Sequence, residues 1–161
     1  MPSQSLPRAS RILQRGTWAG PAADHVLLDF DDRHRRRLHM SGVEGLQFLL
    51  DLPKAQHLRS GDALELEDGR LIAIQAQREQ LIEATAPDCE QMARLAWHIG
   101  NRHLPMEVTQ TALRIRADSI IEAMLMGLGA TLQPIDAPFE PENSASGAQG
   151  SAHSSEDNLA P

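Results

Sequence analysis

Aromatic residues are scarce in this chain of 161 residues, which has three Phe, two Trp and no Tyr. Its apolar cores must therefore be built mainly from aliphatic side chains and Met. The single cysteine, Cys89, excludes an intramolecular disulfide and is typical of a reducing compartment. No segment approaches the roughly 18 consecutive apolar residues of a membrane span, and the first residues lack the apolar stretch of a secretory signal. We therefore expect a soluble cytoplasmic protein with no membrane partner.

Positive charge is also limited, because 22 acidic residues outnumber 15 Lys and Arg residues and give a formal net charge of −7. Nucleic-acid binding requires a basic surface, so we expect no nucleic-acid partner. The sequence also lacks a Gly-x-Ser-x-Gly elbow, a Walker loop and a dinucleotide-binding fingerprint. We expect no enzymatic activity, and a small hydrolase that uses Cys89 or a histidine is a hypothesis without a supporting motif.

The first half of the chain has the short alternating pattern of β strands. Between residues 25 and 76, apolar and polar residues alternate in several short runs. Asp68-Gly69 lies between two of these runs and is a strong signal for a two-residue hairpin turn. Residues 1–23 show little periodicity and are compatible with short strands. We expect a small antiparallel β domain over residues 1–76.

The second half alternates strand patterns with two helical ones. One helix begins after Asp88, a suitable N-cap that forms a capping-box pattern with Gln91, and it continues to about Arg102. Asp118 is a suitable N-cap for a second helix. Strand patterns before, between and after the helices complete the order β-α-β-β-α-β, which is that of a ferredoxin-like domain. We expect this domain over residues 77–137, and an α+β fold for the chain as a whole.

The composition changes after Pro138, where small, polar and acidic residues dominate. Such residues bury too little apolar surface to offset the entropy lost on ordering. We therefore predict a disordered C-terminal tail over residues 138–161. The tail contains one histidine, His153.

Two histidines flank the predicted end of the first helix. His98 lies on its last turn and His103 just beyond it, because Gly100-Asn101 suits a left-handed helix end. Five residues on an ideal helix make a rotation of roughly 500°, so the two imidazoles would project about 140° apart. They do not form a chelating pair within one chain, and the other ligands of a metal at His103 would come from a second chain or from the tail. Alternatively, a histidine at a helix C-terminus only interacts favourably with the helix dipole.

The residues around this pair are more specific than their spacing. Residues 98–105, His-Ile-Gly-Asn-Arg-His-Leu-Pro, resemble the signature of the UreE family of urease accessory proteins, which are nickel metallochaperones. Residues 64–72, Leu-Glu-Leu-Glu-Asp-Gly-Arg-Leu-Ile, are similar to part of that family's N-terminal domain. The resemblance extends from about Leu27 to about Ile135. It implies two domains, one that binds partner proteins and one that binds metal and forms a homodimer.

The resemblance also implies a function, which is delivery of Ni(II) as cargo to apo-urease during assembly of the urease metallocentre. It implies His103 as the central ligand, with one metal shared by two copies of the chain. The partners expected from it are the urease apoprotein and other urease accessory proteins, including the nickel-handling GTPase. Imidazole also binds zinc and copper, so the same site is compatible with Zn(II) or Cu(II) in vitro.

The tail departs from the family pattern. Many UreE proteins end in a His-rich tail that holds additional nickel, whereas His153 is the only histidine after Pro138 in this chain. We predict His153 as a second, mobile ligand that closes over metal held by His103, with His98 in a supporting role. The alternative for His153 is a solvated side chain that binds nothing. Some family members carry further histidines in the segment that corresponds to residues 114–119, and their absence here makes a secondary site doubtful.

The densest charge cluster is the basic run from Arg33 to Arg37. It is either a docking surface for an acidic partner or, in the interpretation adopted here, an exposed strand edge that its charge protects against aggregation. We interpret Cys89, in the first turn of the first helix, as a small, partly buried thiol. If the two histidines only complete a helix, the chain is instead a protein-binding adaptor with no physiological metal.

Overall fold

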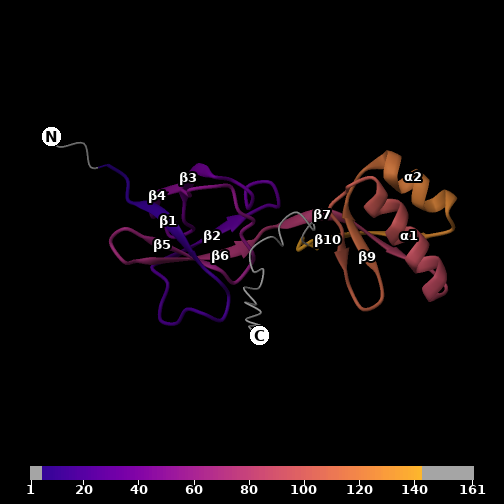
Figure 1. Ribbon diagram of the computed structural model, residues 1–161, viewed down its shortest axis with the longest axis horizontal. Coiled ribbons are helices and arrows are strands. Elements are labelled where there is room, and N and C mark those ends of the chain that lie inside the picture. The colour runs from indigo at the N-terminus through magenta and orange to yellow at the C-terminus, as the bar shows by residue number, and fades with distance from the viewer. Residues whose placement is uncertain (1–4, 143–161) are drawn as a thin grey trace, which may run out of the picture.

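The computed structural model describes residues 5–142, and these form two domains (Figure 1). The N-terminal domain is a six-stranded sheet with the strand order β2-β6-β5-β1-β4-β3. Its strands are β1 (Arg8–Leu13), β2 (Asp24–Leu28), β3 (Arg37–Ser41), β4 (Gln47–Asp51), β5 (Ala63–Leu66) and β6 (Leu71–Ala76). The predicted N-terminal β domain is therefore confirmed.

The sheet of this domain is mixed rather than purely antiparallel. β1 runs parallel to β4, and β2 runs parallel to β6, whereas the other strand pairs are antiparallel. β1 comes from the segment of little periodicity, and it lies between β4 and β5. The prediction of an antiparallel sheet is wrong because apolar alternation identifies strands but does not determine which strands become neighbours.

The hairpin predicted at Asp68-Gly69 joins β5 to β6. The main-chain N–H of Leu66 donates to the carbonyl oxygen of Arg70 (2.9 Å), and the N–H of Gly69 donates to that of Leu66 (2.9 Å). Gly69 has a φ of +87°, a left-handed conformation that glycine adopts without steric cost. The loop therefore contains three residues, with glycine in the left-handed position, rather than the two that we predicted.

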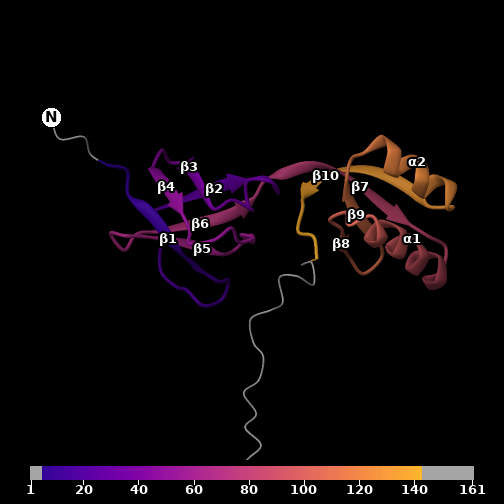
Figure 2. The same cartoon turned by 45° about the horizontal axis from the view of Figure 1, so that its top comes forward.

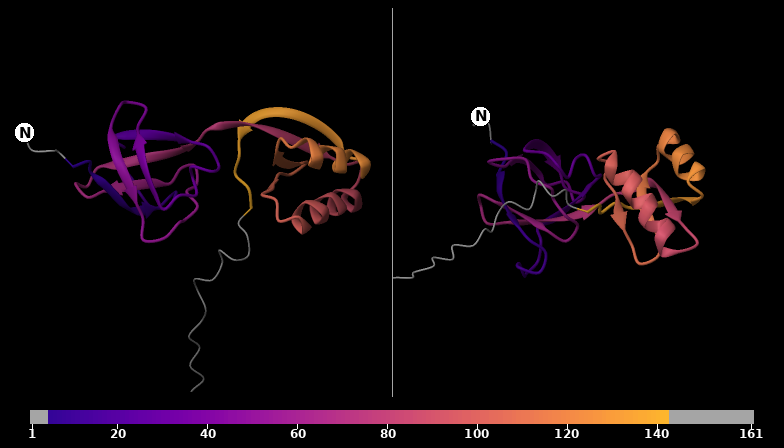
Figure 3. Two further views of the ribbon diagram at one scale, coloured as in Figure 1. Left: turned by 90° about the horizontal axis from the view of Figure 1, so that it is seen from above. Right: turned by 45° about the vertical axis from the view of Figure 1, so that its right-hand side comes forward.

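The C-terminal domain has the predicted β-α-β-β-α-β order. Its four-stranded sheet has the order β10-β7-β9-β8, and all its pairs are antiparallel. Figure 2 and Figure 3 show both helices on the same face of this sheet. The elements are β7 (Arg78–Thr85), α1 (Cys89–Asn101), β8 (Glu107–Val108), β9 (Leu113–Arg116), α2 (Ser119–Gly127) and β10 (Thr131–Pro138).

Both helices begin at the aspartates predicted as N-caps. Asp88 accepts a hydrogen bond from the main-chain N–H of Gln91 (2.7 Å), and Asp118 accepts from the first turn of α2. The Gln91 side chain does not complete the capping box, because its amide donates to the carbonyl oxygen of Leu128 at the end of α2. Gln91 therefore ties the start of one helix to the end of the other.

Each domain has its own apolar core. One cluster lies within the N-terminal sheet, around Phe48 and Leu64, and the other lies between the second sheet and its helices, around Leu95 and Leu125. The long β7–β10 pair, from Thr85↔Thr131 to Arg78↔Pro138, leads from the second domain back to the junction (Figure 3). No helix within residues 5–142 is both long and apolar enough to cross a membrane.

The ordered chain continues beyond the predicted start of the tail. Pro138 ends β10, Phe139 is fully buried, and the main-chain N–H of Glu142 donates to the carbonyl oxygen of Met106 (2.8 Å). The predicted boundary at residue 138 is therefore wrong, because one apolar residue, Phe139, anchors a segment whose average composition is polar. The rest of the predicted tail, residues 143–161, lies outside the described residues.

Candidate metal centre

Helix α1 ends in a Schellman motif, and His103 occupies its turning point. The N–H of His103 donates to the carbonyl oxygen of Gly100 (2.9 Å), and that of Leu104 donates to Ile99 (3.5 Å). These bonds satisfy carbonyl groups that the end of a helix leaves unpaired. Leu104 also packs against the core that contains Ile99, which is the apolar contact that often accompanies this motif. The position of His103 is thus fixed by its own main-chain bond and by the bond and packing of Leu104.

The backbone of His103 is left-handed, with a φ of 55°. Within residues 5–142 it is the only residue other than glycine with a positive φ. This conformation costs an L-residue with a Cβ atom roughly 1–2 kcal/mol. Our prediction that Gly100-Asn101 forms the turn is wrong, because α1 continues through both residues. An unfavourable backbone conformation at a non-glycine residue suggests that its side chain has a function.

The His103 imidazole is exposed, and the part of the chain that the structure describes places no complete metal site around it. In the described part of the chain, no group of three or more His, Cys, Asp or Glu side chains is placed to hold a metal ion. A metal bound at His103 therefore requires ligands from a second chain, from residues after Glu142 or from solvent.

His98 lies on the last turn of α1, as predicted, and is half-buried. Its ring packs edge-on against Trp97, with 5.0 Å between ring centroids. Its carbonyl oxygen accepts a hydrogen bond from Nη1 of Arg102 (3.1 Å). These contacts are structural, and a supporting role for His98 at a metal stays a prediction.

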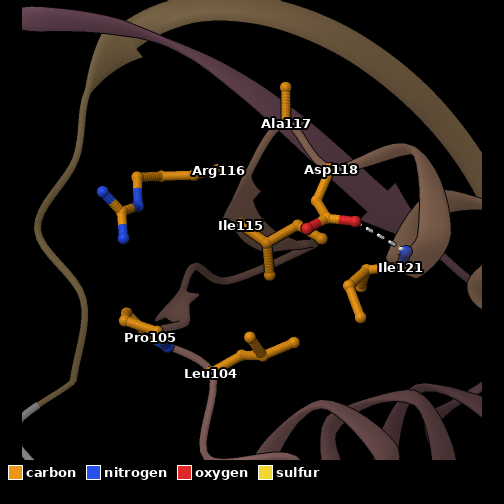
Figure 4. A pocket seen from close by; sticks show the side chains of 7 residues that line it. All are labelled: Leu104, Pro105, Ile115, Arg116, Ala117, Asp118 and Ile121. Carbon is orange, nitrogen blue, oxygen red and sulfur yellow. Dashed lines mark hydrogen bonds between the residues drawn. The ribbon is translucent and has the colours of Figure 1, made fainter.

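A shallow hollow of about 290 Å³ adjoins the segment that follows His103 (Figure 4). Leu104 and Pro105 form one wall, and the start of α2, where Asp118 accepts a hydrogen bond from the N–H of Ile121 (3.1 Å), forms another. The lining contains no histidine or cysteine, so it offers none of the ligands that nickel prefers. The hollow lies beside the candidate centre and is not itself a metal site.

Comparison with known proteins gives matches over both domains. The family model "UreE urease accessory protein, N-terminal domain" matches residues 6–77, and the corresponding C-terminal domain model matches residues 79–159. The chain belongs to the UreE family of urease accessory proteins. A UreE from Beijerinckia indica subsp. indica is 56% identical over 91% of this chain and 84% of its own length. UreE proteins from a Bradyrhizobium species and Rhodobacter capsulatus are 57% and 44% identical, over 91% and 88% of this chain and 70% and 88% of their own lengths. Membership of this family assigns the chain to urease maturation.

The second predicted ligand of this UreE-family chain, His153, lies outside the described residues. The segment that carries it begins after Glu142, whose N–H is bonded to Met106 (2.8 Å). Met106 is three residues from His103 in the sequence, so the segment starts close to the candidate ligand. Sequence reasoning missed this attachment, because no pattern pairs Glu142 with a residue 36 positions earlier.

The basic run of this family member does not form one surface. Arg33 is fully buried and bonded to Glu140, 107 residues away, with 2.8 Å between Nη1 and Oε1. Arg35 is exposed and pairs with Asp32 (3.4 Å), and Arg37 begins the edge strand β3. Both interpretations of the run as an exposed feature are therefore wrong for Arg33. A run of like charges does not indicate that one of its members is buried against a distant carboxylate.

Cys89 is the first residue of α1, as predicted, but it is exposed. The interpretation as a partly buried thiol is wrong, because the first turn of α1 projects Cys89 away from the core that Leu95 and Ile99 enter. The amphipathic pattern of α1 predicts its buried face, and Cys89 lies off that face.

Proposed function

We propose that this UreE-family chain is a homodimeric, non-catalytic metallochaperone that carries Ni(II) as cargo to apo-urease during assembly of the urease metallocentre. The observation that carries this proposal is the exposed imidazole of His103, held at a conformationally costly position without a second ligand from the described part of its own chain. The family assignment supports the urease part of the proposal.

A single exposed ligand per chain suits a shared metal. In a dimer with two-fold symmetry, a residue near the axis meets its own copy, so two His103 imidazoles would face one ion. Two imidazoles bind nickel, and zinc or copper in vitro, while leaving coordination positions open for an acceptor. A carrier must release its cargo, and an incomplete ligand set favours transfer over retention.

His153 is proposed as a further ligand, supported by the length of the chain that carries it. Residues 142 and 153 are 11 positions apart, a span of at most about 40 Å when fully extended. Because Glu142 is bonded to Met106, His103 lies within reach of a ligand on this segment.

The N-terminal β domain is proposed to engage the urease apoprotein and other accessory proteins, including the nickel-handling GTPase. Arg35, Arg36 and Arg37 remain exposed on this domain and suit an acidic partner, whereas the buried Arg33 does not. We propose the cytoplasm as the compartment, since the exposed thiol of Cys89 suits a reducing environment.

Titration calorimetry of the full chain with Ni(II) tests the metal site. We expect a tight site with one nickel per two chains, and His103→Ala should remove it. His39→Ala is the matched control, because His39 is an exposed histidine on β3 in the other domain. Wild-type affinity in the His103→Ala variant would show that the assigned ligand is wrong.

One observation favours the adaptor without metal as a second candidate function. The main-chain N–H of His103 already closes α1, so the residue has a structural task that needs no ion. Native mass spectrometry of the protein after nickel exposure at neutral pH separates the two functions. A dimer that stays metal-free would support the adaptor, and a dimer with bound nickel would contradict it.

A further inference from the structure

A buried arginine connects the two domains. The Arg33 guanidinium is fully buried, and Nη1 donates to Oε1 of Glu140 (2.8 Å) while Nη2 donates to the carbonyl oxygen of Phe139. Nε donates to the carbonyl oxygen of Asp29 in its own domain (3.2 Å). Since Phe139 and Glu140 follow β10, this one side chain bonds both the N-terminal domain and the end of the C-terminal domain.

Glu140 is the second half of this connection. Its Oε1 also accepts the main-chain N–H of Ser60 (3.0 Å), and its Oε2 lies 3.7 Å from Nη1 of Arg59. Its own N–H donates to Oε2 of Glu107, in β8 (3.0 Å). Glu140 is thus held from the N-terminal domain through its carboxylate and from the C-terminal domain through its main chain.

An aromatic group packs beside these bonds. The Phe30 ring lies 5.3 Å from the His57 ring and 5.4 Å from the Phe139 ring, between centroids. The Arg116 guanidinium lies over Phe30, with 4.9 Å from Cζ to the ring centroid, and pairs with Asp31 (3.1 Å). Phe30 and His57 belong to one domain, and Phe139 and Arg116 belong to the other. The junction is therefore a packed interface and not only a covalent linker.

Among the described residues, His57 has the one buried side-chain nitrogen or oxygen atom without a hydrogen-bond partner. Its Nε2 is buried and has no hydrogen-bond partner among the described residues. The charged or titratable groups that face it are Arg33, Arg59, Glu140 and, at 6.0 Å between ring centroids, His34. Burial, and then the two arginines, lower the pKa of His57 below its ordinary value. These effects favour the neutral form of the His57 imidazole, which lies beside the ion pair of Arg33 and Glu140.

We propose that Arg33, Glu140 and His57 form an interdomain latch that holds the two domains in one orientation at neutral pH and opens in mild acid. A proton on His57 would place a third cation beside Arg33 and Arg59. The carboxylates of Glu140, Glu79 and Asp29 already act on Arg33, and Glu140 is the carboxylate that acts on His57. The buried Nε2 of His57 also has no acceptor for the added proton among the described residues. Because the released imidazole recovers an ordinary pKa of about 6.5, the latch has its full strength above that value. It weakens as the pH falls from there toward the lowered pKa of the closed state.

The latch also fixes the chain that leads to the C-terminal segment. The segment of residues 139–142 is held at both ends. Phe139 accepts a hydrogen bond from Arg33, and the N–H of Glu142 donates to the carbonyl oxygen of Met106 (2.8 Å). Opening of the latch removes the bonds from Arg33 to Phe139 and Glu140. Glu142 is then held by its own contact with Met106 and by the neighbouring bond of the Glu140 N–H to Glu107. The amide of Glu142 is therefore a reporter of the latch, and its acceptor, a main-chain carbonyl, does not titrate in this range.

Amide hydrogen exchange of the full chain, resolved by residue and corrected for the intrinsic effect of pH, tests the proposal without any metal. We expect the protection of Glu142 to fall about tenfold between about pH 7.5 and about pH 5.5, a change of about 1.4 kcal/mol. Protected amides inside β7 and β9 should keep their protection. Equal protection of Glu142 at both pH values would overturn the proposal.

Two variants and their two matched controls test which side chains cause the acid response of Glu142. Arg33→Gln should lower the protection of Glu142 at both pH values, whereas Arg35→Gln, the same change at an exposed position of the same run, should not. His57→Phe should keep the latch closed at both pH values, whereas His39→Phe, at an exposed position of β3, should keep the acid response. A wild-type acid response in His57→Phe would contradict the role of His57. If Arg33→Gln does not fold, Glu140→Gln tests the same ion pair.

Discussion

At the scale of single residues, His103 has a left-handed backbone conformation that favours glycine, but its proposed metal ligand is an imidazole that glycine lacks. We predict that His103→Gly separates the effect of the backbone on stability from the effect of the side chain on nickel binding. The free energy of unfolding should rise by up to about 1 kcal/mol, because glycine adopts the left-handed conformation without the cost of a Cβ atom. Nickel binding should be lost at the same time. Urea unfolding and nickel calorimetry on the same preparation measure both effects.

His98→Gly is the matched control for this prediction, because it makes the same substitution inside α1, five positions earlier. It should lower the free energy of unfolding by about 1 kcal/mol, the usual penalty of glycine in a helix. A loss of stability in both variants would show that the left-handed conformation of His103 is not costly.

At the scale of elements, one carboxylate holds the β3–β4 turn to β2. Asp24, at the start of β2, is buried, and its oxygens accept the N–H groups of Glu44 (2.9 Å), Leu46 (3.0 Å) and His25 (2.7 Å). Gly42 is required beside it, since a Cβ atom there would lie 1.9 Å from Oδ2. A turn far from the candidate metal centre thus depends on a single ionised side chain.

We predict that this carboxylate makes the protein sensitive to strong acid. Burial alone would raise the pKa of Asp24, but the three N–H donors outweigh it and hold the pKa below the ordinary value of 3.8. The stabilisation is therefore complete above pH 3.8 and is lost as the pH falls toward the lowered value. Asp24→Asn should cost about 1–3 kcal/mol at neutral pH and reduce the acid dependence.

Asp51→Asn provides the control for Asp24→Asn, because Asp51 forms an exposed ion pair with Arg8 (3.1 Å). Its loss should cost no more than about 1 kcal/mol. Denaturant unfolding of both variants and the wild type between neutral and acidic pH is the measurement. An Asp24→Asn variant as stable as Asp51→Asn would contradict the role given to the turn.

At the scale of the whole molecule, a structural feature can be predicted from the sequence when the residues that cause it lie close together in the chain. Asp88 and Asp118 begin their helices because a cap needs only neighbours within three residues, and the hairpin at Gly69 depends on an equally short segment. The bond between Arg33 and Glu140 joins residues 107 positions apart, and no pattern in either segment predicts it. Similarly, His103 is identified by the string around it, but its backbone conformation emerges only from the packing of Leu104 and the end of α1.

The assembly of two chains gives the last prediction, because the proposed site needs one His103 from each. Wild-type and His103→Ala chains that carry different affinity tags can be mixed, and the mixed dimers isolated by two successive purifications. If the metal is shared, a mixed dimer retains one imidazole, and its nickel affinity should fall by about tenfold or more, at least 1.4 kcal/mol. Mixed dimers of wild-type and His39→Ala chains should bind like the wild type. If each chain instead forms its own site, mixed dimers will bind half as much nickel with wild-type affinity, a result that would exclude a shared metal even if His103 is a ligand.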